Sequence, residues 1–575
     1  MTPIKKQTGG APQHKKKQFR ASLRIIPLGG QEEVGRNMTI FELDNDIVIL
    51  DMGVQFPEEY MHGIDYIIPN ISYLKGKERN IRGVIFSHGH LDHIGAAPIL
   101  LEKLGNPLIV GRPLTLGLIK NRQEDYKKNT ASKLKTLLIN SVNQTIRLGA
   151  FTVKFFPVDH SIMDAVGVIL ETAHGTIIHP GDWTYEKNPL NRKPITYHQL
   201  SKLKKPTVLM LESLGATQTR ERIPEQTMYQ NTEKLIRQAP GRVIISTFAS
   251  QVERIKLMLE FAEKYGRKVA LDGYSMKVNI ELAKQFGYIK IKSKTIIPIE
   301  RVNNFPDKRV VIICTGAQGE NRAVLSRMVN GEHRFVKIKK HDTVIFSSSV
   351  IPGNEVTIQR LKDNLYRLCD NVVHSDIMDV HSSGHSSASD MVEVIKQINP
   401  TYFLPVYANH YFLKEAEKLM VRNHFPEKSI FILDNGSILE FKNGRPNMLK
   451  EKAKTDYVYV DGLGVGDISH VILRDRHTLS EDGMVIVIAK ISNRTGELIG
   501  EPDLIMKGFI NETLNKEKQL IQNTKQRIKK ILKDKEPRSA ASEGYQRQKI
   551  TEDLGQYFFN KTERRPMILP VLINV

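Results

Sequence analysis

Residues 84–93 read Val-Ile-Phe-Ser-His-Gly-His-Leu-Asp-His, and this stretch decides the fold class and the chemistry. Its apolar start predicts a buried strand, and the polar residues that follow predict a loop beyond the strand end. That loop carries His88, His90, Asp92 and His93, and imidazole and carboxylate groups are the ligands that zinc and similar ions select. The spacing directs His88 and His90 to one side and Asp92 and His93 to another, which predicts two metal positions. A polar loop with solvated histidines is the alternative.

The length and composition of the chain favour a globular protein with several domains. With 575 residues, of which 40% are hydrophobic, the chain is too long for one core, so two or three domains are expected. It has no run of eighteen apolar residues and no apolar signal segment at its start, so we expect a cytoplasmic protein with no membrane partner. Only two cysteines are present, Cys314 and Cys369, so histidine, aspartate and glutamate must hold any metal.

The charge of the chain favours a polyanionic partner such as a nucleic acid. The formal net charge is +21, and positive charge promotes phosphate contacts and counterion release. Residues 1–20 contain six lysines and arginines and no acidic residue, which predicts a disordered basic arm. This arm could add affinity for RNA or only improve solubility, and the sequence leaves both roles open.

Polar residues that suit a metal site also follow three other predicted strands. Asp51, His160 and Asp182 each come shortly after a short apolar run. Ligands of open sheets bind beyond the strand ends, so one crevice could gather these side chains with the loop after residue 87. Asp51 could instead cap a turn, or it could orient a metal-bound histidine from behind.

A second α/β unit is predicted after Glu212, which ends a strand at 207–211. Short apolar strands alternate there with helical patterns, which is typical of a parallel sheet. The predicted strands are 242–246, 268–271, 310–313 and 343–346, and the predicted helices include 250–265 and 275–286. Several of the strands end in loops rich in glycine and serine, which can bind phosphate or form ordinary turns.

Several of these motifs resemble known families. The His-x-His-x-Asp-His motif followed by His160 and Asp182 resembles the metallo-β-lactamase superfamily. Glu212 and Gly384-His385 resemble its β-CASP branch of nucleases, and within that branch the sequence is similar to ribonuclease J. The resemblance runs from about residue 22 to the end. Further stretches that carry it are 63–69, 247–250, 325–334, 351–355, 461–467 and 564–570.

The resemblance implies an α/β fold: a metallo-β-lactamase αββα sandwich with an inserted β-CASP α/β domain and a small C-terminal α+β domain. The last domain supports dimerisation in the family. The expected boundaries are a basic arm at 1–20, a first sandwich part at 21–215, a β-CASP domain at 216–375, a second sandwich part at 376–450, a linker at 451–462 and a C-terminal domain at 463–575.

The resemblance also implies roles for individual residues. His88, His90 and His160 would hold one divalent ion, Asp92 and His93 a second, and Asp182 would bridge them. His/Asp sets accept zinc, which we expect here, and also manganese. Three catalytic residues are implied: His385 as general acid, Glu212 as the residue that orients it, and Asp92. His385 could instead bind a phosphate or cap a helix. The candidates for binding a 5′-phosphate are Ser250, His385, Ser386 and Ser387.

One position departs from the family pattern. Ribonuclease J has a histidine ligand of the second ion in Pro-Val-His-Gly-Glu-Tyr, where this chain reads Pro405-Val406-Tyr407-Ala408-Asn409-His410-Tyr411. A phenol binds a metal well only after it loses its proton, whose ordinary pKa is about 10. Tyr407 or His410 could take the place of the missing histidine, or the second ion could bind loosely.

The function implied by the resemblance is a two-metal ribonuclease. It would digest RNA in the 5′→3′ direction from 5′-monophosphate ends, with some internal cleavage, in RNA maturation and decay. The resemblance also implies a homodimer or higher homo-oligomer, or an assembly with a paralogue. Tyr407 favours an alternative, a weakly active partner subunit that binds RNA or an active paralogue. DNA remains open as a substrate, whereas the inserted domain and the positive charge argue against a small ester.

Overall fold

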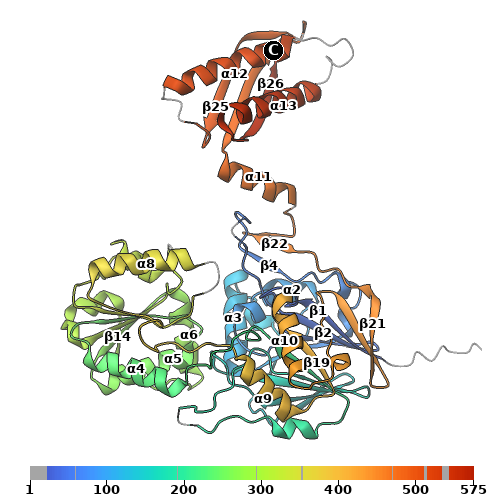
Figure 1. Ribbon diagram of the computed structural model, residues 1–575, viewed down its shortest axis with the longest axis vertical. Coiled ribbons are helices and arrows are strands. Elements are labelled where there is room, and N and C mark those ends of the chain that lie inside the picture. Colours follow the sequence, from blue (N-terminus) through green and yellow to red (C-terminus); the bar gives the residue numbers. More distant parts are fainter. Residues whose placement is uncertain are drawn as a thin grey trace, which may run out of the picture. The chain divides into compact units, whose positions relative to one another are not determined.

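The computed structural model describes residues 22–575 apart from short gaps, and these residues form two compact units (Figure 1). The first unit comprises the chain up to Gln55 and Ile68–Tyr457, and the second comprises Phe56–Ile67 and Val458–Val575. The basic arm expected at residues 1–20 lies outside the described residues. The internal gaps are residues 59, 191, 293, 321, 351–353, 469, 496, 511–514 and 534–542.

Two mixed β-sheets in the first unit enclose an apolar core between them. Residues of both sheets meet in this core, for example Val48 and Leu439 of one sheet and Val153 and Met210 of the other. The first sheet has the order β21 (Arg445–Lys452), β20 (Ser437–Lys442), β1 (Leu23–Gly29), β2 (Met38–Leu43), β3 (Asp46–Leu50), β5 (Ile81–Ile85), β6 (Ile109–Gly111) and β7 (Thr136–Leu138). The second has the order β19 (Tyr402–Val406), β12 (Thr207–Glu212), β11 (Thr176–His179), β10 (Val166–Glu171), β9 (Phe151–Pro157) and β8 (Thr145–Leu148).

Helices cover the outer faces of this sandwich. On the second sheet, Met391 and Met420 of two helices pack against Leu209 and Phe403 of the strands. These helices are α9 (Ala388–Ile398) and α10 (His410–Arg422). On the side of the first sheet, α3 (Pro113–Tyr126) contacts β6 and β7, and it follows the short helices α1 (Leu91–Ile94) and α2 (Ala97–Lys103). The expected αββα sandwich is therefore confirmed.

The inserted region forms a separate parallel sheet with helices on both faces (Figure 1). Its strands are almost continuously apolar, as expected where both faces of a sheet are covered. The order is β15 (Ile296–Ile297), β14 (Lys268–Asp272), β16 (Val310–Cys314), β13 (Val243–Ser246), β17 (Thr343–Phe346) and β18 (Asn371–Val373). Helices α4 (Glu225–Gln238), α5 (Val252–Lys264) and α6 (Tyr274–Gln285) pack on one face, and α7 (Val324–Val329) and α8 (Glu355–Leu368) on the other.

The insertion lies between two neighbouring strands of the sandwich. Strands β12 and β19 pair in parallel, so Glu212 at the end of β12 is the register partner of Val406 at the end of β19. The 189 residues that separate β12 from β19 therefore leave the second sheet and return to it at adjacent positions. Both strand ends point to the same edge of the sheet, where the candidate site lies.

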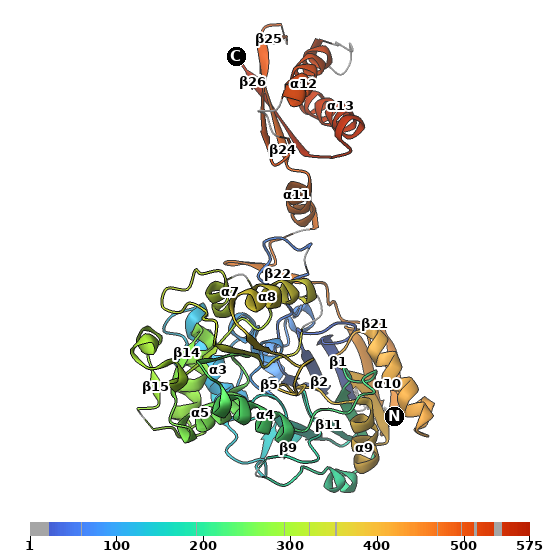
Figure 2. The ribbon, with the colours of Figure 1, turned by 60° about the vertical axis from the view of Figure 1, so that its left-hand side comes forward.

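The second unit contains a three-stranded sheet with two long helices on one side (Figure 2). The sheet has the order β25 (Leu498–Lys507), β24 (Met484–Ile491) and β26 (Met567–Asn574), and the helices are α12 (Asn515–Lys533) and α13 (Glu543–Thr562). Ile528 and Phe558 of the helices pack against Val485 and Val487 of the central strand. A second small sheet has the order β23 (Gly464–Val465), β22 (Val458–Asp461) and β4 (Tyr66–Ile68), and α11 (His470–Glu481) follows it.

The structure differs from the sequence expectation in two stretches near the C-terminal domain. The short apolar run 470–473 fits either a strand or a helix by its sequence, and in the structure it begins α11. The stretch 451–462 was expected to be a linker, but its first two residues complete the edge strand β21 and Val458–Asp461 form the strand β22. Residues 56–67 join the second unit through the pairing of β4 with β22, a long-range contact that no local pattern encodes.

Candidate metal centre

Four of the expected ligands converge at the edge of the sandwich and form what we call the first ligand group: His88, His90, His160 and Asp182. His90 Nδ1 lies 3.1 Å from His88 Nε2 and 3.0 Å from His160 Nε2. Asp182 Oδ2 lies 3.9 Å and 3.8 Å from the same two Nε2 atoms. Ligand atoms around an ion with bonds of about 2.0–2.2 Å lie about 2.8–3.6 Å apart, so this group fits one divalent cation after small adjustments.

In three histidines the Nδ1 atom, which faces away from the ligand groups, has a hydrogen-bond partner. His88 Nδ1 lies 3.0 Å from Ser87 Oγ, His160 Nδ1 donates to Gly384 O over 2.9 Å, and His93 Nδ1 donates to Asp51 Oδ2 over 2.8 Å. These contacts aim each Nε2 at the centre of the site. Burial, followed by the neighbouring histidines, lowers the pKa of His88, so its ring is neutral as metal binding requires.

Asp51 is the anchor of this arrangement. Its carboxylate is fully buried and accepts hydrogen bonds from the amide and the hydroxyl of Ser87, each over 2.8 Å, as well as from His93. Its backbone has a φ of +61°, a left-handed conformation that non-glycine residues rarely adopt. The structure thus places Asp51 behind the ligands rather than among them.

A second ligand group consists of Asp92, His93 and Asp182. His93 Nε2 lies 3.3 Å from Asp182 Oδ1 and 3.4 Å from Asp92 Oδ2. Asp182 therefore offers Oδ2 to the first group and Oδ1 to the second. The side-chain amide of Asn37 lies beside this group, with Nδ2 2.9 Å from His93 Nε2 and 3.3 Å from Asp92 Oδ2.

His385 and Glu212 lie next to the ligand groups. His385 Nδ1 is 3.6 Å from Glu212 Oε2, and the two rings of His385 and His160 are 6.0 Å apart. The Glu212 side chain is buried, whereas that of His385 is 38% exposed and can reach a substrate. Burial lowers the pKa of His385, but Glu212 and then Asp182 and Asp92 outweigh it and raise that pKa to about 9. His385 is therefore protonated at neutral pH.

Three consecutive carbonyl groups hold the loop 381–387, which we call the His385 loop. The carbonyl of Ser382 accepts a hydrogen bond from Arg254 over 3.1 Å, and that of Ser383 accepts one from Arg222 over 2.9 Å. The third is Gly384 O, bonded to His160. Arg254 lies on α5 of the inserted domain, so that domain, the loop and a ligand histidine form one connected unit.

Tyr407, and not His410, lies beside the second ligand group. The Tyr407 ring packs edge-on against His93 at 5.3 Å and contacts His179 at 5.0 Å, and its side chain is buried. Burial raises the pKa of the Tyr407 phenol well above its ordinary value, and Asp51 raises it further. His410 instead has a 53% exposed side chain, 4.0 Å from Glu32, because it begins α10 on the outer surface. His410 does not replace the missing histidine.

Of the three serines expected to bind a 5′-phosphate, two use their hydroxyls in hydrogen bonds within the protein. The Ser386 hydroxyl is buried and donates to Trp183 O over 3.0 Å. The Ser387 hydroxyl is buried as well and caps α9 together with Asp390, a reciprocal pair that satisfies the helix N-terminus. Their hydroxyls are therefore structural, and this correction leaves Ser250, which is half-buried in the loop between β13 and α5, and His385.

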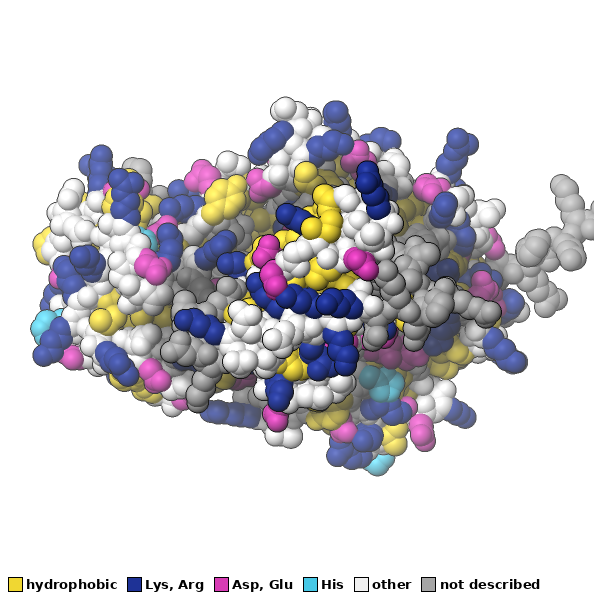
Figure 3. Space-filling view, turned by 90° about the horizontal axis from the view of Figure 1, so that it is seen from above, with side chains coloured by type: hydrophobic (Ala, Val, Ile, Leu, Met, Phe, Trp, Pro, Cys, Tyr) yellow, Lys and Arg dark blue, Asp and Glu magenta, His cyan; other side chains and the backbone are white. Residues whose placement is uncertain are grey.

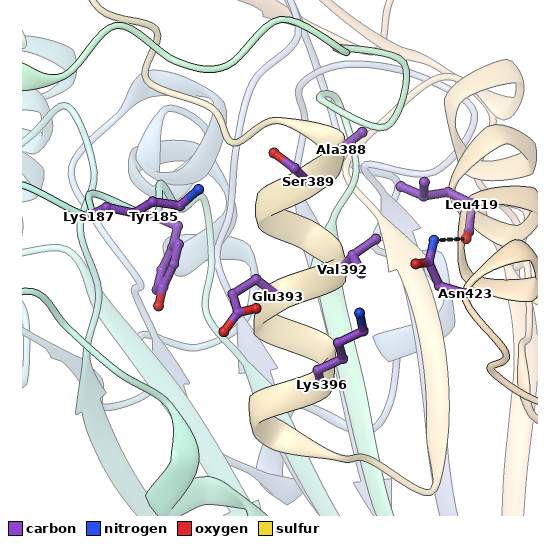
Figure 4. A pocket seen from close by; sticks show the side chains of 9 residues that line it. All are labelled: Tyr185, Lys187, Ala388, Ser389, Val392, Glu393, Lys396, Leu419 and Asn423. Atoms are coloured by element: carbon purple, nitrogen blue, oxygen red, sulfur yellow. Dashed lines mark hydrogen bonds between the residues drawn. The ribbon is translucent and has the colours of Figure 1, made fainter.

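One hollow of the first unit lies away from these residues. It has a volume of about 670 Å³ and lies over α9 and α10 (Figure 4). Its wall combines Lys187, Lys396 and Glu393 with Tyr185, and none of the expected site residues lines it. Figure 3 shows lysine and arginine side chains spread between fewer acidic ones, with some apolar side chains exposed among them. Among the described residues, no helix has the length and apolarity to span a membrane.

Comparisons with known proteins agree with this architecture. The model "Ribonuclease J, beta-CASP domain" matches residues 240–365, "Ribonuclease J C-terminal domain" matches 471–575, and "Metallo-beta-lactamase superfamily" matches 32–216. A relative named Ribonuclease J2 from Bacillus subtilis (strain 168) is 32% identical over 97% of this chain and 100% of its own. The chain belongs to the ribonuclease J family. Ribonuclease J 1 from Streptococcus pyogenes serotype M3 is 33% identical, over 96% of this chain and 97% of its own. Ribonuclease J 2 from Staphylococcus aureus (strain MRSA252) is 30% identical over 96% and 98%.

Three residues of this ribonuclease J family site were not among the sequence candidates: Asn37, Arg222 and Arg254. Asn37 follows Gly35-Arg36 in a loop far from the histidine motif, and the arginines are two among 84 basic residues. Only the long-range pairing of strands and domains brings them to the site. A buried arginine gives no local signal, because most arginines lie on the surface.

Proposed function

We propose that the chain is a metal-dependent ribonuclease that hydrolyses RNA phosphodiesters. One observation supports this most directly: two groups of ligand atoms share Asp182 and lie beside an exposed histidine, His385, whose pKa the neighbouring Glu212 raises to about 9. Membership of the ribonuclease J family and the net charge of +21 support RNA as the substrate.

The ligand residues would hold two divalent ions. His88, His90, His160 and Asp182 would hold the first, and Asp92, His93 and Asp182 the second. Bound divalent ions lower the pKa of a coordinated water and neutralise charge on the phosphate that is attacked. Zinc suits the three imidazoles of the first group, and manganese is the alternative.

The protein's own residues would supply the proton that the leaving 3′ oxygen needs. His385 would donate a proton from its imidazolium to the leaving 3′ oxygen, and Glu212 would hold His385 in its charged form and in place. Asp51 would fix the tautomer of His93, and Gly384 O that of His160. Arg222 and Arg254 would hold the His385 loop in its position beside the ligand residues.

We propose 5′→3′ exonucleolysis from 5′-monophosphate ends, with internal cleavage as a second mode. Ser250 and His385 are the candidates to receive the terminal phosphate. The test is RNA labelled at its 3′ end and carrying either a 5′-monophosphate or a 5′-triphosphate, incubated with zinc or manganese. Faster loss of the monophosphorylated RNA, with mononucleotides as products, supports the proposal, whereas equal rates and internal fragments alone contradict the exonuclease assignment.

A weakly active partner subunit is the second candidate, and Tyr407 is the observation that favours it. Because the pKa of its phenol is raised, Tyr407 stays protonated at neutral pH and is a poor replacement for a histidine ligand. Turnover of RNA by the isolated chain separates the two candidates. A partner subunit would show little turnover alone, and Tyr407→His would then raise the rate sharply.

We also propose that the C-terminal domain forms a homodimer. The face of its sheet opposite α12 and α13 carries a row of apolar side chains, because Ile486 is paired with Ile505 on one side and with Leu569 on the other. Ile505 and Leu569 are 41% and 49% exposed. Leu569→Asp should convert a dimer into a monomer in light scattering, and an unchanged mass would contradict this surface as the interface.

A further inference from the structure

Asn37 already lies at the distances expected for a metal ligand. Its side chain is buried, and its amide is 2.9 Å from His93 Nε2 and 3.3 Å from Asp92 Oδ2. These separations match those among Asp92, His93 and Asp182, which are 3.3 Å and 3.4 Å. Atoms that share one ion with bonds of about 2.0–2.2 Å lie about 2.8–3.6 Å apart, so the amide completes the second ligand group.

The backbone holds Asn37 in this position and leaves its amide free to turn. Its N–H donates to Asp92 O over 3.0 Å, and its carbonyl accepts from Gly53 N over 2.9 Å. Asn37 Oδ1 is buried and has no hydrogen-bond partner among the described residues, an unfavourable arrangement for a polar atom. Nitrogen and oxygen occupy equivalent places in an amide, so a half-turn about its last torsion brings Oδ1 to the present place of Nδ2.

The two orientations suit two states of the site. With Nδ2 inward, the amide donates to the carboxylate of Asp92. With Oδ1 inward, it offers a lone pair to an ion between Asp92 and His93. Gly30 leaves room for the amide, because a Cβ at that position would be 2.4 Å from Asn37 Oδ1 and 2.8 Å from Tyr407 Cδ1.

We propose that Asn37 Oδ1 is the fourth ligand of the second ion, and that this position selects a hard divalent cation such as Mn²⁺ over Zn²⁺. The first ligand group offers three nitrogens and one oxygen, a set that suits zinc. With Asn37 the second group offers three oxygens and one nitrogen, a set that suits manganese and magnesium. This inference rests on the two-ion site proposed above and concerns the composition of its second position.

The test measures metal binding by the full-length protein. The chain is stripped with a chelator, loaded with one equivalent of Zn²⁺ and titrated with Mn²⁺, whose free form is followed by electron paramagnetic resonance. Wild type should bind one Mn²⁺ beside one Zn²⁺. Asn37→Ala should keep the Zn²⁺ and weaken Mn²⁺ binding at least ~10-fold, the usual effect of disturbing a metal site. Asn37→Asp, which keeps the oxygen, should bind Mn²⁺ at least as tightly as wild type, and the exposed Asn447→Ala should leave both ions unchanged.

Two results would overturn the inference: an unchanged Mn²⁺ affinity in Asn37→Ala, or a wild type that prefers Zn²⁺ at the second position. RNA digestion by the wild type, measured in parallel, separates this inference from the proposed function. If RNA is digested but Asn37→Ala binds Mn²⁺ normally, the role of Asn37 fails alone. If Mn²⁺ binding depends on Asn37 but no RNA is digested, the ribonuclease assignment fails alone.

Discussion

The Nδ1–H of His160 donates a hydrogen bond to the carbonyl oxygen of Gly384 over 2.9 Å. This contact joins a metal ligand of the sandwich to the loop that carries His385. The same loop is bonded to Arg254 of the inserted domain through the neighbouring carbonyl of Ser382. A substitution in the ligand His160, in the His385 loop or at Arg254 should therefore alter the position of His385, the proposed proton donor.

The first prediction concerns the pH dependence of RNA hydrolysis. A general acid acts only while it is protonated, so the rate should persist up to about pH 9, the pKa of His385, and fall above it. Glu212→Gln removes the negative charge 3.6 Å from His385 and should move this alkaline limb toward the ordinary histidine pKa of about 6.5. Rates of single-turnover RNA cleavage between pH 6 and pH 10 provide the measurement. An alkaline limb at the same pH in both proteins would argue against the pairing.

The second prediction concerns Arg254. Its guanidinium bonds to Ser382 O, Ser347 O and His381 Nδ1, so Arg254→Met should displace the His385 loop without removing a ligand. A misplacement of about 1 Å can cost about 100-fold in rate, so kcat should fall by about 10- to 100-fold, while KM changes little. Steady-state kinetics measure both parameters. In the pH profile of the variant, the fall in rate at alkaline pH that depends on His385 should be less pronounced than in wild type. The exposed Arg360→Met is the matched control, and equal kinetics of the two variants would contradict the role.

The third prediction concerns Asp51. Asp51→Asn keeps the shape of the side chain but removes the charge that holds His93 Nδ1–H and the Ser87 amide. Metal affinity of the second position should fall about 10- to 100-fold, while the first position keeps its ion. Metal content after dialysis against increasing chelator concentrations measures both positions. Parallel loss of both ions would show instead that Asp51 only supports the fold.

Much of the site follows from local sequence, because ligands that lie at strand ends carry a recognisable motif. His88, His90, Asp92 and His93 belong to one loop, and their spacing alone indicates two metal positions. The structure brings His160, Asp182 and Asp51 to the same edge, as expected for polar residues beyond strand ends.

Other features could not be predicted, because they depend on long-range packing. Ser387 was expected at the substrate, but it occupies the N-cap of α9, a role that needs the helix to begin at Ala388. Asn37 comes from the loop between β1 and β2 and reaches Asp92 through long-range hydrogen bonds of its backbone and side chain. Neither fact leaves a signature in a single stretch of residues.

The fourth prediction concerns the stability of the inserted domain. Arg242 and Asp342 are each 1% exposed and form two hydrogen bonds, of 2.9 Å and 2.6 Å. Asp342→Ala leaves the Arg242 charge buried without its partner, which should lower the free energy of unfolding by about 3–5 kcal/mol. Chemical denaturation followed by circular dichroism measures this loss. Asp307→Ala removes an exposed ion pair with Lys339 and should change stability little. Similar losses in the free energy of unfolding for the two variants would contradict a stabilising role of the buried Arg242–Asp342 pair.

We propose that the histidines of the first ligand group would hold a divalent ion that RNA hydrolysis requires. The most direct measurement compares digestion of 5′-monophosphorylated RNA by wild type, His90→Ala and His341→Ala, each assayed with its zinc and manganese content determined. His341 is 74% exposed and serves as the matched histidine control. We predict that His90→Ala loses the first ion and all digestion, while His341→Ala behaves as wild type. Digestion by His90→Ala at the wild-type rate would contradict the account.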